Sequence, residues 1–214
     1  MRIAILGLSG DPMHLGHVAV ALAIRAMGYE RVWLMITPQN PLKQAAAVPY
    51  WHRRELARLL TKGHEDWLEV CDFEAGVAVH DPDLRTHTVL SALRERMPEV
   101  EFTFVLGADA WADAEKGFHT WTNFMEIPAL ASLLILPREP WTNCVLACPA
   151  AQALAHRHFA GDGPVPVGCW RVASAPIDHP ASSTGVRENL KMRRASEHLT
   201  DAQNVYVRDN RLYE

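Results

Sequence analysis

Short apolar runs alternate with longer segments of helical periodicity along most of this chain, and this alternation restricts the fold more than any other feature. Parallel strands need a crossover connection, which is usually a helix, so the order predicts strands joined by helices. We therefore expect an α/β protein of the Rossmann-like type, an open parallel sheet with helices on both faces. The predicted strands are residues 2–6, 31–36, 67–71, 101–106, 132–136 and 169–173, and the predicted helices are residues 16–27, 50–62, 88–97, 149–159 and 183–194.

Residues 1–214 are predicted to form a single domain. A chain of 214 residues can bury a substantial core, and no repeat, low-complexity segment or linker divides it. Residues 183–214 are expected to be a C-terminal helical part that completes the site. In an open parallel sheet the ligand lies at the carboxyl ends of the strands, so the loops there should meet in one crevice.

The composition excludes several classes of function. A net charge of −4 argues against a nucleic-acid binder that neutralises many phosphates, although it leaves room for one local anion site. The chain contains neither an apolar run of about 18 residues nor a secretory signal pattern, so we expect a cytoplasmic protein that does not bind membranes.

Four cysteines are present: Cys71, Cys144, Cys148 and Cys169. Zinc sites usually contain closely spaced pairs, and the spacing of Cys144 and Cys148 alone is a weak metal signal. We interpret all four as free thiols in a reducing compartment and predict no metal site.

The segment Gly7–His17, with the sequence GLSGDPMHLGH, joins the first predicted strand to the first predicted helix. A helix N-terminus carries unpaired N–H groups and a positive dipole, so it attracts phosphate, and glycines allow the backbone to approach an anion. His14 and His17 are three residues apart and can both donate to one ligand. A zinc-binding pair is the competing interpretation, but no third ligand lies at a suitable spacing. A turn with two histidines by chance is the other alternative.

A second helix start lies at 182-SSTGVRENL-190. Ser182 or Ser183 is a good N-cap, and capping alone would explain the serines and Thr184. Capping does not explain Arg187, which lies one turn into the helix and can reach an anion held at its N-terminus. Together with the first segment, this one is interpreted as the opposite side of a polyphosphate site.

Two further groups belong to loops at strand ends. Gly107 and Asp109 follow the fourth predicted strand and suit a ribose-binding turn, because a carboxylate accepts hydrogen bonds from hydroxyl groups. Trp121 can stack on a flat heteroaromatic ring, although a tryptophan in a loop is more often packed in a core. Lys43, on the extended loop after the second strand, can meet an anion or be an ordinary solvated lysine.

Taken together, these residues resemble the nucleotidyltransferase superfamily with HxGH and SSTxxR signatures, and within it the bacterial nicotinate-nucleotide adenylyltransferases. His14–His17 matches the first signature and Ser182–Arg187 matches the second. Gly107–Asp109 followed by Trp121, Asn40–Lys43 followed by Arg53, and the ending Tyr206–Tyr213 are similar to further family segments, so the resemblance covers nearly the whole chain.

The resemblance implies transfer of AMP from ATP to nicotinate mononucleotide, giving deamido-NAD and pyrophosphate, a step of NAD biosynthesis. Mg²⁺ would be bound with ATP and not by a dedicated protein site. The implied catalytic residues are His14, His17 and Arg187. The implied ATP contacts are these three with Gly7, Leu8, Ser9, Gly107, Asp109, Ser183 and Thr184, and the implied contacts to the pyridine nucleotide are Lys43, Arg53, Thr86, Thr88, Trp121 and Thr122.

The sequence departs from the family pattern at three places. Leu8 and Gly10 replace a glycine and an aromatic residue of the first loop, so we expect a repacked ATP loop. The family pattern Tyr-Thr-x-x-Thr-Leu is replaced by Leu84–Val89, and the segment between Asp109 and Trp121 is longer than usual. The alternatives are the same chemistry on nicotinamide mononucleotide or pantetheine phosphate, and a nucleotide-binding relative without catalysis. The assembly state is left open, and a homo-oligomer is compatible with the sequence.

Overall fold

The computed structural model describes residues 1–38, 48–78, 85–174 and 179–214 of the chain. Within these residues the centre of the fold is a six-stranded sheet in the order β3-β2-β1-β4-β5-β6, and every pairing is parallel. The strands are β1 (Arg2–Leu8), β2 (Arg31–Ile36), β3 (Leu68–Cys71), β4 (Glu101–Gly107), β5 (Ser132–Leu136) and β6 (Trp170–Val172). The predicted open parallel sheet is confirmed, and each predicted strand lies within two residues of its observed bounds.

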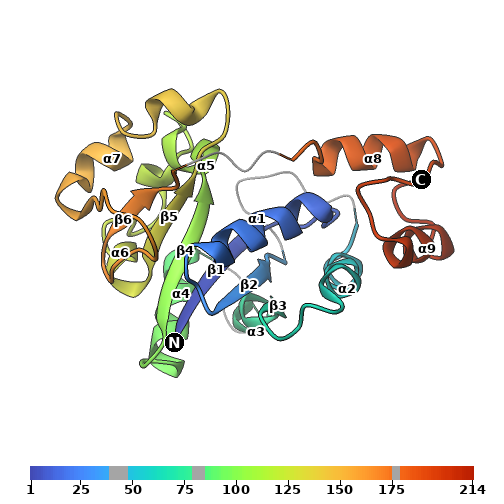
Figure 1. Cartoon of the computed structure of the whole chain (residues 1–214), viewed down its shortest axis with the longest axis horizontal. Helices are drawn as coiled ribbons and strands as arrows, with labels where there is room; N and C mark the ends of the chain where they lie inside the picture. The colour runs from blue at the N-terminus through green and yellow to red at the C-terminus, as the bar shows by residue number, and fades with distance from the viewer. Residues whose placement is uncertain (39–47, 79–84, 175–178) are drawn as a thin grey trace.

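The order of the strands places a switch point between β1 and β4. The chain first builds outward from β1 through β2 to β3, then crosses back and builds outward in the other direction from β4 to β6. Connections leave these two central strands toward opposite sides, which opens a crevice at their carboxyl ends. The loop after β1 and the turn after β4 therefore both lie at this edge of the sheet (Figure 1).

Helices and 3₁₀ turns connect the strands. The helices are α1 (Leu15–Ala26), α2 (Tyr50–Thr61), α3 (Phe73–Ala78), α4 (Thr86–Arg96), α5 (Ala108–Ala112), α6 (Ile127–Leu130), α7 (Pro149–Ala153), α8 (Ser183–Lys191) and α9 (Asp201–Asp209), and the 3₁₀ turns are Phe118–Thr120, Trp141–Cys144 and Ala155–Arg157. No helix in the described ranges is long and apolar enough to cross a membrane.

The two faces of the sheet are buried in separate cores. Side chains alternate between the faces of a strand, so Ile3 and Ile5 of β1 lie in one core while Ala4 and Leu6 lie in the other. Leu90 of α4 belongs to the first core and Ile24 of α1 to the second. Helices therefore cover both faces, as the alternation of the sequence predicts.

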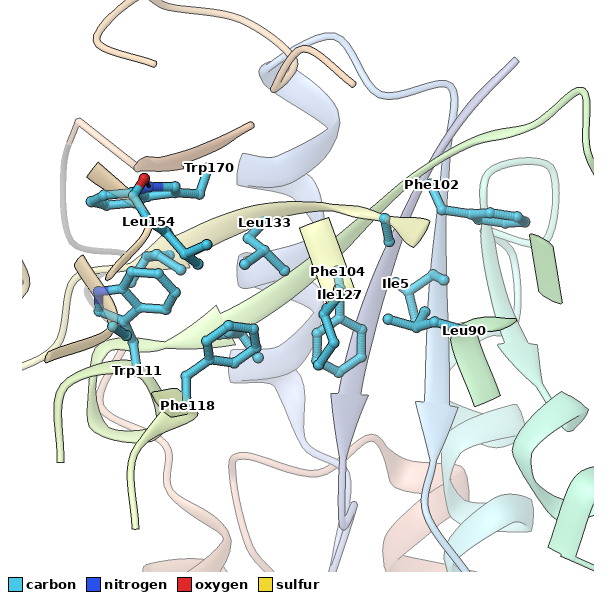
Figure 2. Close-up of a cluster of buried hydrophobic side chains, with 14 of the residues drawn as sticks. Ile5, Leu90, Phe102, Phe104, Trp111, Phe118, Ile127, Leu133, Leu154 and Trp170 are labelled. Atoms are coloured by element: carbon cyan, nitrogen blue, oxygen red, sulfur yellow. Dashed lines mark hydrogen bonds between the residues drawn. The ribbon is translucent and has the colours of Figure 1, made fainter. Parts of the chain in front are cut away.

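The first core extends into an aromatic cluster beyond β5 and β6. Trp111 packs against Phe118 and Trp170, with ring centroids 5.2 and 4.9 Å away, and Figure 2 shows these rings gathered beside Leu133 and Leu154. Both indoles are buried and hydrogen-bonded: Trp111 Nε1 donates to the Val145 carbonyl at 2.9 Å, and Trp170 Nε1 donates to that of Leu154 at 2.7 Å. The cluster thus holds the short elements between β4 and β6 in place.

The C-terminal residues 183–214 pack against α2 and lie away from the sheet in Figure 1. A third apolar cluster, which includes Leu56, Val186 and Val207, joins α2 to α8 and α9. Gln203 of α9 is fully buried, and its amide donates to the carbonyls of Met13 and Leu56 at 3.0 and 2.9 Å. This amide ties the C-terminal part to the loop that follows β1.

The prediction of one helix over residues 149–159 is wrong. Helix α7 ends at Ala153, because Phe159 N–H donates to the Trp170 carbonyl at 2.8 Å and His158 forms a bridge with the same tryptophan. Pairing with the sheet edge keeps this segment extended. The helix predicted over residues 183–194 ends at Lys191, and Arg193 has a φ of 55°.

Candidate active site

The loop after β1 explains the two unusual residues of the first segment. Strand β1 continues to Leu8, which is in register with Ile36 of β2 and packs against the second core. Gly10 has a φ of +60°, and a Cβ there would lie 3.2 Å from Leu8 Cδ1 and from Met13. Glycine is therefore required where the chain turns away from the sheet, and the Leu8 side chain packs against this turn.

The C-terminal part of the chain holds this loop. Arg187 Nη1 donates to the Asp11 carbonyl at 2.5 Å, and Ser183 Oγ donates to the Pro12 carbonyl at 3.0 Å. The Tyr213 hydroxyl donates to Asp11 Oδ1 at 2.9 Å, and burial together with this carboxylate raises the pKa of Tyr213. The two segments predicted to face each other are thus in direct contact, about 170 residues apart in sequence.

The two histidines of the first segment lie together at the N-terminus of α1. Their ring centroids are 4.0 Å apart. The backbone N–H of His14 donates to His17 Nδ1 at 3.2 Å, so a neutral His17 carries its proton on Nε2. The side chain of His14 is 6% exposed, and its Nδ1 has no hydrogen-bond partner within the described part of the chain.

Both imidazoles are neutral at pH 7. Burial, followed by electrostatic repulsion between a protonated His14 and the rings of His17, His179 and His198, lowers the pKa of His14 to about 3. Burial also lowers the pKa of His17 to about 4, and Arg138 and His179 add to this effect. Neutral rings can donate an N–H to an anionic oxygen without binding a further proton.

Gly16, between the two histidines, has a steric role. A Cβ on Gly16 would lie 2.9 Å from the His14 ring and 3.1 Å from His179 Nδ1. Both distances are shorter than ordinary van der Waals contacts. Only glycine therefore lets both imidazoles pack over the first turn of α1.

The start of α8 has the predicted cap. Ser182 Oγ accepts from Gly185 N–H at 3.1 Å, and Arg187 Nη2 donates to Thr184 Oγ1 at 3.1 Å. Arg187 therefore bridges the first turn of α8 and the Asp11 carbonyl and is held at the crevice. Ser9 Oγ, across from it in the first loop, is buried without a hydrogen-bond partner among the described residues.

Gly107 and Asp109 lie at the carboxyl end of β4, as predicted. Gly107 is the N-cap residue of α5, and Asp109 lies in the first turn of that helix. A Cβ on Gly107 would collide with Asp109 Oδ1, so glycine is required for this carboxylate to fold back over the strand end.

One residue predicted to contact the pyridine nucleotide, Thr86, lines a recess beside β4. The recess is lined by Met35, Glu74, Thr86, Val89, Leu90 and Phe104. Trp121 packs edge-on against Phe104 with ring centroids 6.4 Å apart, and its Nε1 is buried without a partner in the described ranges. Of the remaining predicted residues, Thr88 is half-buried and Thr122 is exposed, and neither is among the described lining residues. The recess thus brings Thr86 close to the aromatic pair.

The side chain of Arg53 is held by the backbone of the protein. It is 2% exposed, and its guanidinium donates to four backbone carbonyls: those of Ser9 at 2.5 Å, Thr37 at 2.9 Å, Pro38 at 2.6 Å and Val48 at 3.2 Å. Four of its five N–H groups are therefore engaged in joining loops. These bonds give Arg53 a role in positioning the loops, and its predicted direct contact with the pyridine nucleotide stays a prediction. Lys43 lies outside the described residues.

Three cationic or imidazole side chains near the crevice were not identified from the sequence: Arg138, His179 and His198. Arg138 follows the carboxyl end of β5, so the rule that indicated Gly107 and Asp109 also applies to it. His179 lies three residues before Ser182, and the ring of His198 is 6.0 Å from that of His179. No local pattern distinguishes these two histidines from the nine others in the chain.

The geometry is suited to binding an anion, and it offers no nucleophile for covalent catalysis among the donors that meet there. Two helix N-termini, two neutral imidazoles and a fixed guanidinium meet at the switch point of the sheet. Such donors bind a ligand with several anionic oxygens and stabilise charge that moves between them.

Comparison with known proteins agrees with this geometry. Residues 9–189 match the family model described as cytidylyltransferase-like. A protein of Gluconobacter oxydans named "Probable nicotinate-nucleotide adenylyltransferase" is 30% identical over 204 residues, which is 92% of this chain and 99% of that protein. A protein of the same name from Methylorubrum extorquens (strain PA1) is 32% identical over 194 residues, covering 87% of this chain and 99% of its own.

Among solved structures, the chain resembles Plasmodium falciparum nicotinic acid mononucleotide adenylyltransferase complexed with NaAD. The TM-score is 0.70 at 17% identity, and the match covers 99% of this chain and 97% of that one. At this identity the likeness establishes the fold.

Proposed function

The chain belongs to the cytidylyltransferase-like family, and within it to the nicotinate-nucleotide adenylyltransferases, and we propose from this membership that it transfers AMP from ATP to nicotinate mononucleotide. The products are deamido-NAD (NaAD) and pyrophosphate, and the reaction is a step of NAD biosynthesis. The observation that carries the proposal is the meeting of His14, His17 and Arg187 at the switch point, in a chain with these relatives.

In the proposed reaction, an oxygen of the 5′-phosphate of nicotinate mononucleotide attacks the α-phosphorus of ATP. A phosphorus–oxygen bond forms on the attacking side, and the bond to the bridging oxygen breaks, so that pyrophosphate leaves with the electron pair. Phosphoryl transfer of this kind needs alignment and charge stabilisation more than covalent catalysis. Donors fixed before the reaction supply both, because they need no reorganisation when charge develops.

His17 is proposed to contribute most to stabilising the transition state. Its Nδ1 accepts the His14 N–H, which leaves Nε2–H as its donor to a phosphate oxygen. His14 is proposed to contact the same triphosphate, because its buried Nδ1 lacks a partner among the residues that the structure describes. Arg187 and the N-terminus of α8 at Ser183 and Thr184 are proposed to hold the outer phosphates, where negative charge accumulates on the leaving group.

The first loop and the end of β4 are proposed to complete the ATP site. Gly7, Leu8 and Ser9 are proposed to supply backbone close to the phosphates, and this is supported by the buried Ser9 hydroxyl, which has no partner in the described part of the chain. Gly107 and Asp109 are proposed to hold the adenosine ribose, because a carboxylate at the end of a central strand accepts from hydroxyl groups.

Mg²⁺ is proposed to be bound by the phosphates of ATP. The protein groups at the crevice are N–H donors suited to anionic oxygens, and the described residues contain no group of three His, Cys, Asp or Glu side chains that could hold a metal. When bound with ATP, the ion neutralises phosphate charge.

The pyridine ring is proposed to stack on Trp121, beside the recess that contains Thr86 and Phe104. The backbone near Thr88 and Thr122 is proposed to receive the pyridine carboxylate, and Lys43 is proposed to approach the nucleotide phosphate.

The test is an assay of purified protein with ATP, Mg²⁺ and nicotinate mononucleotide, in which NaAD and pyrophosphate are both quantified. Equal formation of the two products is expected. A parallel reaction with nicotinamide mononucleotide separates acid from amide preference. If the protein binds ATP but forms no pyrophosphate with either acceptor, the chain is a nucleotide-binding relative without catalysis, and the proposed function is wrong.

A further inference from the structure

His179 lies beside the proposed phosphate site, and only one of its two ring nitrogens has a hydrogen-bond partner among the described residues. Its Nδ1 accepts from Ala181 N–H at 3.1 Å, so a neutral ring carries its proton on Nε2. The same hydrogen bond fixes the ring to the chain immediately before Ser182, the N-cap of α8. The orientation of the ring is therefore set by the segment that carries Arg187.

The ring also packs against the start of α1. His179 Nδ1 and the His14 ring both lie close to the point that a Cβ of Gly16 would occupy, at 3.1 and 2.9 Å. The two imidazoles thus flank the same glycine. On its other side, His179 packs edge-to-face against His198, with ring centroids 6.0 Å apart, and the His198 carbonyl accepts from Leu15 N–H at 2.9 Å.

Two buried polar atoms indicate that a ligand belongs at this place. His14 is 6% exposed and its Nδ1 has no partner, and Ser9 Oγ is also buried without one, in the part of the chain that the structure describes. Buried polar groups in folded proteins are nearly always hydrogen-bonded, so such atoms mark a site completed by another molecule. The N–H donors around them select anionic oxygens.

We propose that His179 is a further ATP-contacting residue, whose Nε2–H donates to an oxygen of the β- or γ-phosphate. This inference rests on the proposed function for the identity of the ligand, but the phosphate contact itself does not depend on catalysis. The β- and γ-phosphates are assigned because Ala181 anchors the ring to the start of α8, whose Arg187 and N-terminus face the same end of the crevice. His179 would then stabilise pyrophosphate as the leaving group.

Two substitutions of His179 test its two ring nitrogens separately: Nδ1, which accepts from Ala181 and anchors the ring, and Nε2, the proposed donor to phosphate. In His179→Asn the amide oxygen takes the place of Nδ1 and keeps the bond to Ala181, but the Nε2 donor is lost. In His179→Gln the side chain reaches the Nε2 position and keeps a donor, but the anchor is lost. His156→Asn, at an exposed histidine on a 3₁₀ turn, is the matched control.

Binding of inorganic tripolyphosphate to the intact protein, measured by calorimetry, tests the contact directly. His179→Asn is expected to weaken binding about tenfold, the effect of one lost hydrogen bond to a charged group, while His179→Gln retains part of the affinity and His156→Asn all of it. Unchanged binding in His179→Asn, or an equal loss in both His179 variants, would overturn the inference. If the wild-type protein has no transferase activity but His179→Asn still weakens tripolyphosphate binding, the proposed function is wrong and the inference about His179 stands.

The reverse reaction, in which NaAD and pyrophosphate form ATP and nicotinate mononucleotide, shows which part of the nucleotide His179 contacts. His179→Asn is expected to raise the KM for pyrophosphate about tenfold and to leave the KM for NaAD unchanged. A raised KM for NaAD with an unchanged KM for pyrophosphate would place His179 against the adenosine part and contradict the proposal.

Discussion

The hydroxyl of Tyr213 donates to Asp11 Oδ1 at 2.9 Å and so joins the last turn of the chain to the loop that follows its first strand. Both side chains are buried, at 7% and 8% exposure. Arg187 and Gln203 reach the same loop through the carbonyls of Asp11 and Met13. The phosphate loop is therefore shaped as much by the end of the chain as by its own sequence.

Tyr213→Phe is expected to loosen this loop without disturbing the sheet. Loss of one buried hydrogen bond to a carboxylate should lower the free energy of unfolding by about 1.5–3 kcal/mol and raise the KM for ATP. Urea unfolding and steady-state kinetics measure the two effects. Tyr206→Phe is the control, because its hydroxyl contacts His52 at 2.9 Å, away from the loop; an equal rise in the KM for ATP there would contradict the interpretation.

His17→Asn is expected to lower kcat about 10²–10³-fold, the usual effect of losing one donor at a developing charge. The amide oxygen of asparagine can still accept a hydrogen bond from the backbone N–H of His14, so the conformation of the helix start should be kept. The thermal midpoint of unfolding is expected to stay within a few degrees of the wild-type value. A kcat within threefold of wild type would remove His17 from the transition-state contacts.

The stability of the protein should fall as the pH is lowered from about 7 toward 4. His14 and His17 have pKa values lowered to about 3 and about 4 in the folded protein, whereas their ordinary value is 6.5. Between these values the unfolded chain binds protons that the folded chain does not, so the free energy of unfolding decreases with falling pH and the effect ends below about pH 3. Each imidazole contributes at most about 1.4 kcal/mol per pH unit.

Urea unfolding at pH 5, 6, 7 and 8 measures this slope. The double variant His14→Asn/His17→Asn, which has no titrating ring at these positions, should show a flatter dependence over the same range. An identical slope in the double variant would show that other groups control the acid sensitivity.

Much of the fold was predictable because strands and long helices carry their period in the local sequence. Short elements do not: α3, α5 and α6 span six, five and four residues, too few for a helical period to repeat. The end of α7 depends on Trp170, whose carbonyl holds a segment that local propensity favours as helix.

The candidate site was predictable in part for the same reason. Its two signatures follow recognisable helix starts, and the topology brings their loops together. The role of Gly10 depends on its positive φ and on Leu8 beneath it, and neither is visible in a one-dimensional pattern. The positioning role of Arg53 could not be predicted, because its carbonyl partners Ser9 and Thr37 lie 44 and 16 residues away in sequence.

Arg53→Lys tests the positioning role of this arginine. A lysine cannot donate to four separated carbonyls, so the free energy of unfolding should fall by about 2–4 kcal/mol. The KM values for ATP and for the mononucleotide should rise together, since Arg53 holds both the first loop and the loop after β2. Arg58→Lys, at an exposed arginine of the same helix, is the control. A rise confined to the mononucleotide would restore the direct contact expected from the sequence.

Gly16→Ala should destabilise the protein, although alanine in a helix normally stabilises by about 0.5–1 kcal/mol relative to glycine. The added Cβ would lie 2.9 Å from the His14 ring and 3.1 Å from His179 Nδ1, so one or both rings must move. Activity should fall with stability, because His14 is fixed on the phosphate site by this packing. Gly76→Ala in α3 is the matched control, since a Cβ there meets no atom of the described residues within 4 Å. The free energy of unfolding is expected to fall in Gly16→Ala and to rise in Gly76→Ala. A stabilising effect at Gly16 would mean that the imidazoles are not held by this glycine.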